Sequence, residues 1–350
     1  MSKKNSNFSK LSIAFGVVML AFGVAWNGYA QSTVSTPIVG FMKLSLPAGK
    51  ATLVSFPLNQ SSLVAGAFTG KSGSILSTAA DLSSLPSSLV NSDNEPKYYI
   101  EITSGANAGL IAEVVGKTSN SVTVSSGDAA AFVGTESFQI KKFTTLADVF
   151  GVANSAGLLG GDSVSTSDVV WAVSNGTWRQ YFFYDDGFAG EVDPLQWQTP
   201  GSFVNKGDAR IDPDQGVLVI RKAGTDRSAT ITGVVKSTPS FVPFINGAQI
   251  VTNPYPVDKT LGTLGLKTGN SATGLLEGDS NANSDVVYKL DNGTWKQYFI
   301  YNDGFNGEID PVDWQTPGSN VSQASVTVSA GEALLIIRKG TSFTWNIAGP

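Results

Sequence analysis

Short stretches in which apolar and polar residues alternate recur along the chain from residue 39 onward. Alternation with a period of two is the pattern of a β-strand that buries one face. β-branched and aromatic residues fill these stretches and Gly, Asn and Ser separate them, which is typical of antiparallel strands joined by tight turns. The pattern predicts strands at 39–46, 51–57, 98–102, 110–115, 121–124, 137–140, 167–173, 177–184, 216–221, 284–290, 294–301 and 333–338.

Two segments depart from this alternation. Residues 60–95 are rich in Ser, Ala, Gly and Leu and have weak periodicity, so we expect part short helix and part loop there. Residues 144–150 predict one or two helical turns. Thr144 or Thr145 is the expected N-cap, because a threonine hydroxyl at that position accepts a hydrogen bond from an unpaired N–H of the first turn.

A long passage of the pattern occurs twice. Residues 157–222 and 274–339 align without a gap at a spacing of 117, and more than half of the aligned positions are identical. Asn175-Gly176 and Asn292-Gly293 separate two apolar strands in each copy. They predict type I′ hairpin turns, since both central positions of that turn need a positive φ.

The repeat predicts an all-β protein of two repeated antiparallel β-sandwich or barrel-like modules, the first with an inserted small β subdomain. We place the first module at 31–232, with the inserted subdomain at about 60–142, and the second, minimal module at 233–350. A weaker echo of 49–57 at 246–256 supports this division. A chain of 350 residues is long enough for two domains.

The N-terminus has the parts of a secretory signal peptide. Lys3, Lys4 and Lys10 precede an apolar run over 11–26, and Gly28-Tyr29-Ala30 offers small residues for cleavage. The alternative is a membrane anchor, but the run is short for a spanning helix of ~20 residues and is interrupted by Ser and Gly. We expect residues 1–30 to be removed. The mature protein then has no transmembrane segment and is secreted or in the cell envelope (periplasm, outer surface or extracellular).

The chain contains no His and no Cys, which excludes several kinds of chemistry. Without them there is no imidazole base, Ser-His-Asp triad, thiol nucleophile, zinc-thiolate site or disulfide. Removing the three leader lysines takes the formal charge from −5 to −8. Nucleic acid is not an expected partner, because phosphate binding needs clustered Lys and Arg and the basic residues here form only pairs.

Each copy carries carboxylates close to glycines, a pattern that suits calcium because Ca²⁺ takes six to eight oxygen ligands. The spacing differs from an EF-hand loop, and Asn302 replaces Asp185 in the second copy. The alternative is hairpin-turn chemistry, in which Asp and Asn bond nearby backbone. No cofactor apart from this possible ion is expected. The candidate calcium ligands are Asp185, Asp186, Glu191, Asp193, Asp303, Glu308 and Asp310.

Aromatic residues are concentrated in the repeated hairpins, where flat rings suit stacking on sugars and core packing is the alternative. Alternate strand residues face opposite ways, so only one set in each hairpin is free to bind. The candidate ligand-binding residues are Trp178, Tyr181, Tyr184, Trp197, Trp295, Tyr298, Tyr301 and Trp314. Trp171 and Tyr288 are further aromatic residues of the same hairpins.

A third interpretation is a secreted hydrolase that uses paired carboxylates, as glycosidases do with two acids ~5–10 Å apart. Glu191 and Glu308 are its candidates. Two complete active sites in one small chain explain the repeat less simply than two structural hairpins do. We therefore identify no catalytic residue.

Several motifs together resemble an uncharacterised secreted paralogous family of verrucomicrobial bacteria. They are the opening from Gly40 to Gly49, the strand that ends at Pro57, the Trp178 and Trp295 hairpins, and Asn253-Pro254-Tyr255-Pro256. The resemblance covers nearly the whole mature chain and implies an exported protein with many relatives in one proteome. It implies no activity.

These patterns predict an exported, non-catalytic surface, matrix or adhesion-type structural protein. A carbohydrate-binding protein that uses exposed aromatics is the alternative, and the carboxylate-based hydrolase is the third interpretation. The expected partners are an extracellular glycan or other envelope proteins.

Overall fold

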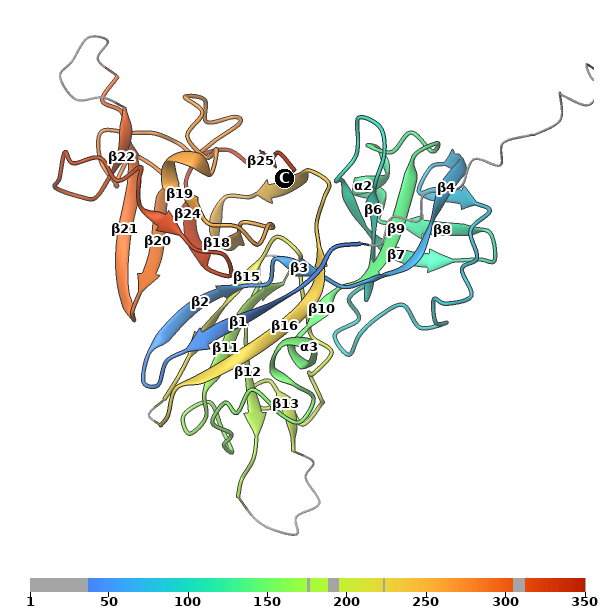
Figure 1. Ribbon diagram of the computed structural model, residues 1–350, viewed down its shortest axis with the longest axis horizontal. Coiled ribbons are helices and arrows are strands. Elements are labelled where there is room, and N and C mark those ends of the chain that lie inside the picture. The colour runs from blue at the N-terminus through green and yellow to red at the C-terminus, as the bar shows by residue number, and fades with distance from the viewer. Residues whose placement is uncertain (1–36, 175–176, 188–194, 223, 305–311, 350) are drawn as a thin grey trace, which may run out of the picture. The chain divides into compact units, whose positions relative to one another are not determined.

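The computed structural model describes residues 37–174, 177–187, 195–222, 224–304 and 312–349. Residues 38–350 belong to one compact unit whose regular secondary structure is almost wholly antiparallel strands (Figure 1). This confirms the predicted all-β fold class. Within the described ranges no helix has the length and apolar character needed to cross a bilayer. The expected signal peptide, residues 1–30, lies outside the described residues.

The first module packs a five-stranded sheet, in the order β13-β12-β11-β15-β2, against a three-stranded sheet, β1-β16-β3. In Figure 1, β1 in blue runs beside β16 in yellow. The Thr145 hydroxyl and the Asp148 carboxylate cap α3 reciprocally, so the predicted N-cap is confirmed. The elements are β1 (Val39–Leu46), β2 (Ala51–Ser55), β3 (Leu58–Asn59), β10 (Thr144–Thr145), α3 (Leu146–Phe150), β11 (Val169–Ser174), β12 (Thr177–Tyr184), β13 (Gln196–Gln198), β14 (Arg210–Ile211), β15 (Gly216–Ile220) and β16 (Arg227–Val235).

The second module has the same five-stranded sheet, in the order β18-β24-β20-β21-β22, but its second sheet has only two strands, β17-β25, and it lacks the insertion. The register recurs at the sequence spacing of 117: Val170 pairs with Tyr181 in the first copy, and Val287 with Tyr298 in the second. The elements are β17 (Ser240–Phe244), β18 (Gly247–Thr252), β19 (Lys259–Thr260), η1 (Leu261–Thr263), β20 (Val286–Asp291), β21 (Thr294–Tyr301), β22 (Asp313–Gln315), β23 (Thr327–Val328), β24 (Ala333–Arg338) and β25 (Phe343–Ile347).

The hairpin turn of the second copy has the predicted conformation. Asn292 has φ 51° and Gly293 has φ 85°, the pair of positive values that a type I′ turn requires. The turn therefore accounts for the Asn-Gly pair between the two strands. The corresponding Asn175 and Gly176 of the first copy lie outside the described residues.

The segment between β3 and β10 forms a closed six-stranded barrel in the order β4-β5-β8-β7-β6-β9. It overturns the expectation of a short helix within 60–95, because the strands β4 and β5 occupy 62–78, whereas 79–95 forms the expected loop. The register of β4 shifts between Phe68 and Gly70, which breaks the alternation, and small residues separate the inward Val64 and Phe68. The elements are β4 (Ser62–Ser72), β5 (Ile75–Thr78), β6 (Tyr98–Ile102), β7 (Ile111–Lys117), β8 (Ser121–Val124), α2 (Ser126–Ala129) and β9 (Ser137–Lys142).

The outer faces of the two five-stranded sheets contact each other reciprocally. Ser55 N donates to Gly331 O at 2.9 Å, and Thr252 N donates to Asp214 O at 3.2 Å. Thr252 is the counterpart of Ser55, and Gly331 of Asp214. Reciprocal contacts of this kind define a twofold interface, here between two halves of one chain. A small apolar cluster that includes Leu53 and its counterpart Ile250 fills the contact.

Each copy also buries one arginine–aspartate pair at the same place. Arg221 Nε donates to Asp168 Oδ2 at 2.7 Å, and Arg338 pairs with Asp285. At most 2% of any of these side chains is exposed. Backbone N–H groups also donate to both carboxylates. Both pairs therefore have the hydrogen bonds that a buried charge needs.

Candidate functional site

Half of the predicted ligand-binding aromatics lie in the module cores. At most 3% of each of these side chains is exposed, because they face the space between the sheets. This corrects our expectation for them: their rings pack the core and are not at the surface. The buried residues are Tyr181, Trp197, Tyr298 and Trp314.

The other predicted aromatics lie nearer the surface. Trp178 is half-buried and Trp295 is 43% exposed. Tyr184 is half-buried and its hydroxyl donates to Asp186 at 3.2 Å. The equivalent Tyr301 donates to Asp303 at 3.1 Å. The two tryptophans are thus the rings best placed to meet a ligand.

Trp178 lines a groove of about 520 Å³ on the first module. Its ring meets that of Trp171 edge to face, with 6.3 Å between ring centroids and 70° between planes. The two are diagonal neighbours on one face of the hairpin, because Trp171 pairs with Gln180 and Val173 with Trp178. We call this the Trp171–Trp178 groove; its lining residues are Asp93, Trp171, Trp178, Arg179, Gln180, Thr199, Pro200, Ser202 and Lys206.

The groove follows an edge of β12. β13 pairs with β12 only along 182–184, and the rest of that edge has no neighbouring strand among the described residues. Gly161 N donates to Phe183 O at 3.1 Å on the side opposite β13. Strand residues direct their backbone groups alternately to the two sides. The backbone N–H and C=O groups of Trp178 and Gln180 therefore point toward the open edge.

Charged side chains form one wall of the groove. Asp93, from the barrel segment, places Oδ1 at 2.6 Å from Lys206 Nζ and Oδ2 at 3.2 Å from Arg179 Nη1. Glu95 Oε1 lies 3.4 Å from the same Nη1. Burial alone lowers the pKa of Arg179, but Glu95, Tyr181 and Asp93 beside the guanidinium raise it above its usual value. The wall thus carries the two cations and Asp93, and Glu95 supports Arg179 from behind the lining as a second anion.

The described acidic residues of the predicted calcium site form turns. Asp185 Oδ1 accepts a hydrogen bond from Gly187 N at 3.0 Å, and Asn302 Oδ1 accepts one from Gly304 N at 2.9 Å. These bonds are the turn chemistry that we gave as the alternative. Among the described residues no group of three or more carboxylates is placed to hold a metal ion. Four of the candidates lie outside those residues: Glu191, Asp193, Glu308 and Asp310.

A second cavity, of about 500 Å³, contains a half-buried acidic pair, Asp212 and Asp214, that the sequence patterns did not single out. Burial raises the pKa of Asp212 to about 7, an effect that Arg210 opposes and Asp214 strengthens. Burial likewise raises the pKa of Asp214 to about 6. Arg210 lies 3.0 Å from Asp212 and 2.5 Å from Glu113, measured from Nε and Nη2 to the nearest carboxylate oxygens. A carboxyl group protonated near neutral pH can donate a hydrogen bond as well as accept one.

One sequence signal does distinguish this cavity. The counterparts of Arg210, Asp212 and Asp214 in the second copy are Thr327, Ser329 and Gly331. The charges therefore belong to the first copy alone, at positions where the repeat has diverged. Asp214 also supplies the carbonyl that bonds Thr252 in the twofold contact. Asp214 of this pair therefore lies at the contact between the two modules.

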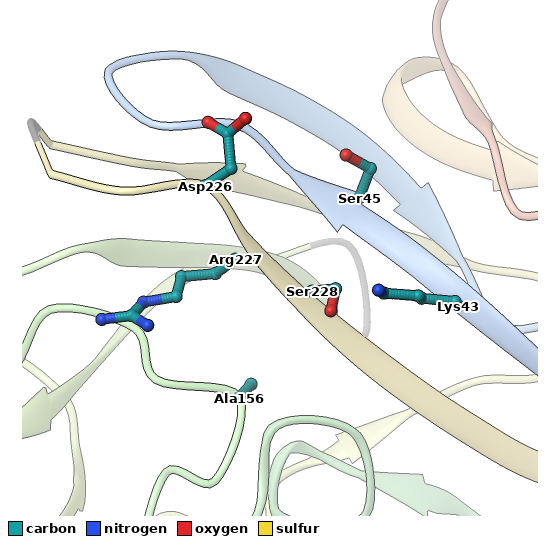
Figure 2. A pocket seen from close by; sticks show the side chains of 6 residues that line it. All are labelled: Lys43, Ser45, Ala156, Asp226, Arg227 and Ser228. Atoms are coloured by element: carbon teal, nitrogen blue, oxygen red, sulfur yellow. The ribbon is translucent and has the colours of Figure 1, made fainter.

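A third hollow, of about 500 Å³, lies over β1 and β16 (Figure 2). In Figure 2, Arg227 extends away from Lys43, and the carboxylate of Asp226 points in another direction again. Asp226 already accepts a hydrogen bond from Ala48 N at 2.9 Å. The polar groups do not converge on one point, so this hollow is a weaker candidate than the Trp171–Trp178 groove.

Comparison of the chain with protein families, with curated proteins and with solved structures finds no match. The resemblance to a secreted verrucomicrobial family therefore remains a prediction.

Proposed function

We propose that this protein is an exported, non-catalytic, adhesion-type protein that binds polysaccharide in the Trp171–Trp178 groove. The observation that supports the proposal is the half-buried indole pair beside an open strand edge. Export is supported by the basic and apolar pattern of the first thirty residues.

The chemistry of the groove matches that of a sugar chain. A pyranose ring has an apolar C–H face, and an indole offers a flat apolar surface of similar size. Sugar hydroxyls need hydrogen-bond partners once they leave water. The Gln180 amide, the Ser202 hydroxyl and the backbone groups of Trp178 provide such partners within the same lining. An aromatic floor with polar groups at its margin is the usual composition of a small-ligand site.

Affinity electrophoresis in gels that contain soluble polysaccharides tests the proposal. We expect retardation of the full chain by at least one of hydroxyethyl cellulose, dextran and galactomannan. Trp171→Ala should weaken that retardation about tenfold or more, because a tryptophan at the centre of a contact typically contributes at least ~2 kcal/mol. The glycan should be recovered with its chain length unchanged, as expected of a non-catalytic binder.

The matched control is Phe41→Ala. Phe41 is 79% exposed on β1 and does not line the groove, so its loss should leave retardation unchanged. Melting curves of both variants show whether the fold is retained. Equal loss of binding in Trp171→Ala and Phe41→Ala would contradict a specific site at the groove.

A further inference from the structure

We infer that the Trp171–Trp178 groove selects uncharged polysaccharide, and that Asp93 of the barrel segment sets this selectivity. The inference rests on the proposed function and adds the charge class of the ligand. It also assigns a role to a residue that belongs to the insertion and not to the repeat.

The charges in and behind the wall balance one another. Lys206 and Asp93 are 9% and 15% exposed, and Arg179 is 30% exposed. Their side chains already lie within ion-pair distance of one another, with Glu95 as the second anion. Two cations that face two carboxylates at 2.6–3.4 Å leave no net positive charge to attract an anion.

An anionic ligand would bind at this wall only at a cost in free energy. A uronate carboxylate could pair with Lys206 or Arg179 only by displacing Asp93 or by lying beside it. Displacement breaks a largely buried ion pair, and proximity places two like charges in a partly desolvated site. A sugar hydroxyl has neither cost, because it accepts from the cations and donates to the carboxylate while the pairs stay intact. The wall therefore favours neutral sugars.

The second copy provides an internal comparison. It keeps the ring pair, with Tyr288 and Trp295 edge to face at 6.1 Å between centroids. Lys206 is replaced by Gln323, and Arg179 by Lys296, which pairs with Asp291 at 2.6 Å on the surface. The aromatic platform is thus common to both copies. The charged wall belongs to the first module, because Asp93 comes from the insertion.

The experiment compares neutral and anionic polysaccharides on the full chain. The probes are hydroxyethyl cellulose, dextran and galactomannan against alginate and polygalacturonate, in affinity gels at low salt. We expect the wild-type chain to be retarded by a neutral polymer and to be retarded at least tenfold less by either polyuronate. Preference for a polyuronate would overturn the inference while leaving carbohydrate binding standing. Retardation by neither class would overturn both proposals.

Two variants change the wall in opposite directions. Asp93→Asn removes one anion and should increase affinity for alginate severalfold, an increase that about 0.5 M salt abolishes by screening. Lys206→Gln copies the residue of the second copy, Gln323, and removes one cation from the wall, so it should bind alginate no better than the wild-type chain does. Circular dichroism of each variant checks that it is folded. An Asp93→Asn protein that is folded and binds alginate no better than wild type would overturn the role of Asp93.

Discussion

Replacing Arg338 with methionine tests whether the repeated buried ion pair stabilises its module. Methionine retains much of the apolar stem of arginine but leaves the Asp285 carboxylate buried without its cation. The guanidinium also donates to the carbonyl oxygens of Gly274 at 3.1 Å, Thr341 at 3.0 Å and Ser271 at 2.6 Å. These carbonyls lose their donor in the variant.

The magnitude follows from the burial. Both side chains are 0% exposed, so solvent does not screen the loss. Removing one partner of a buried pair costs about 3–5 kcal/mol. We expect the upper part of that range for Arg338→Met, because three loop carbonyls are left unsatisfied as well. Arg221→Met should destabilise the first module in the same direction.

A double-mutant cycle in urea, followed by tryptophan fluorescence, measures the interaction. Asp285→Leu combined with Arg338→Met removes both charges, so the double variant should lose at least ~2 kcal/mol less than the sum of the single variants. Lys296→Met is the matched control: it breaks a surface pair in which each side chain is 50% exposed, and it should leave the urea midpoint unchanged. A wild-type midpoint for Arg338→Met, or strict additivity in the cycle, would refute the reasoning.

Three further predictions concern pH and packing. The pKa values of about 7 for Asp212 and about 6 for Asp214 lie above the usual 3.8. The stability that these groups contribute at acid pH is therefore lost as pH rises to about 7. Asp212→Asn should flatten the resulting fall of the urea midpoint between pH 4 and 8. Burial raises the pKa of Glu136, but hydrogen bonds from Val133, Asn107 and Gly134 outweigh it and lower the pKa to about 2. The stability that Glu136 contributes above pH 4.5 is therefore lost as pH falls toward 2, and Glu136→Gln should remove that loss in acid titrations. A Cβ on Gly216 would lie 2.5 Å from the Cβ of its counterpart Ala333, so Gly216→Ala should lower stability by about 1–3 kcal/mol, and adding Ala333→Gly should restore part of it in calorimetry.

The strands of the repeat were predictable because period and turn chemistry agree there. β20 and β21 alternate clearly and are joined by Asn292-Gly293, whose backbone has the required positive φ values. The two-residue strands β3, β10, β14, β19 and β23 were not predictable, since two residues carry no period. β4 was missed because its register shift interrupts the alternation.

The aromatic groove was predictable only in part. Trp178 was a candidate, but each face of its hairpin carries aromatic residues, so the pattern could not decide which face is buried. The position of Tyr181 in the core settles that question. Asp93 could not be found from sequence, because it lies 113 positions from Lys206 and reaches it only through the fold of the insertion. The same holds for the Asp212 cavity, whose raised pKa values come from burial.

The positions that the two copies share and the positions at which they differ have different physical roles. Shared residues such as Trp197 and Trp314, or the two buried aspartates, are fixed by packing, because a close-packed interior tolerates little change in volume or charge. The residues that line the charged wall are changed in the second copy or have no counterpart there. If the identical residues of the repeat were kept in order to bind one shared ligand, the residues of the charged wall would be the same in both copies, as the core residues are. We therefore expect the two ring pairs to differ in ligand preference, with the Tyr288–Trp295 face insensitive to Asp93→Asn.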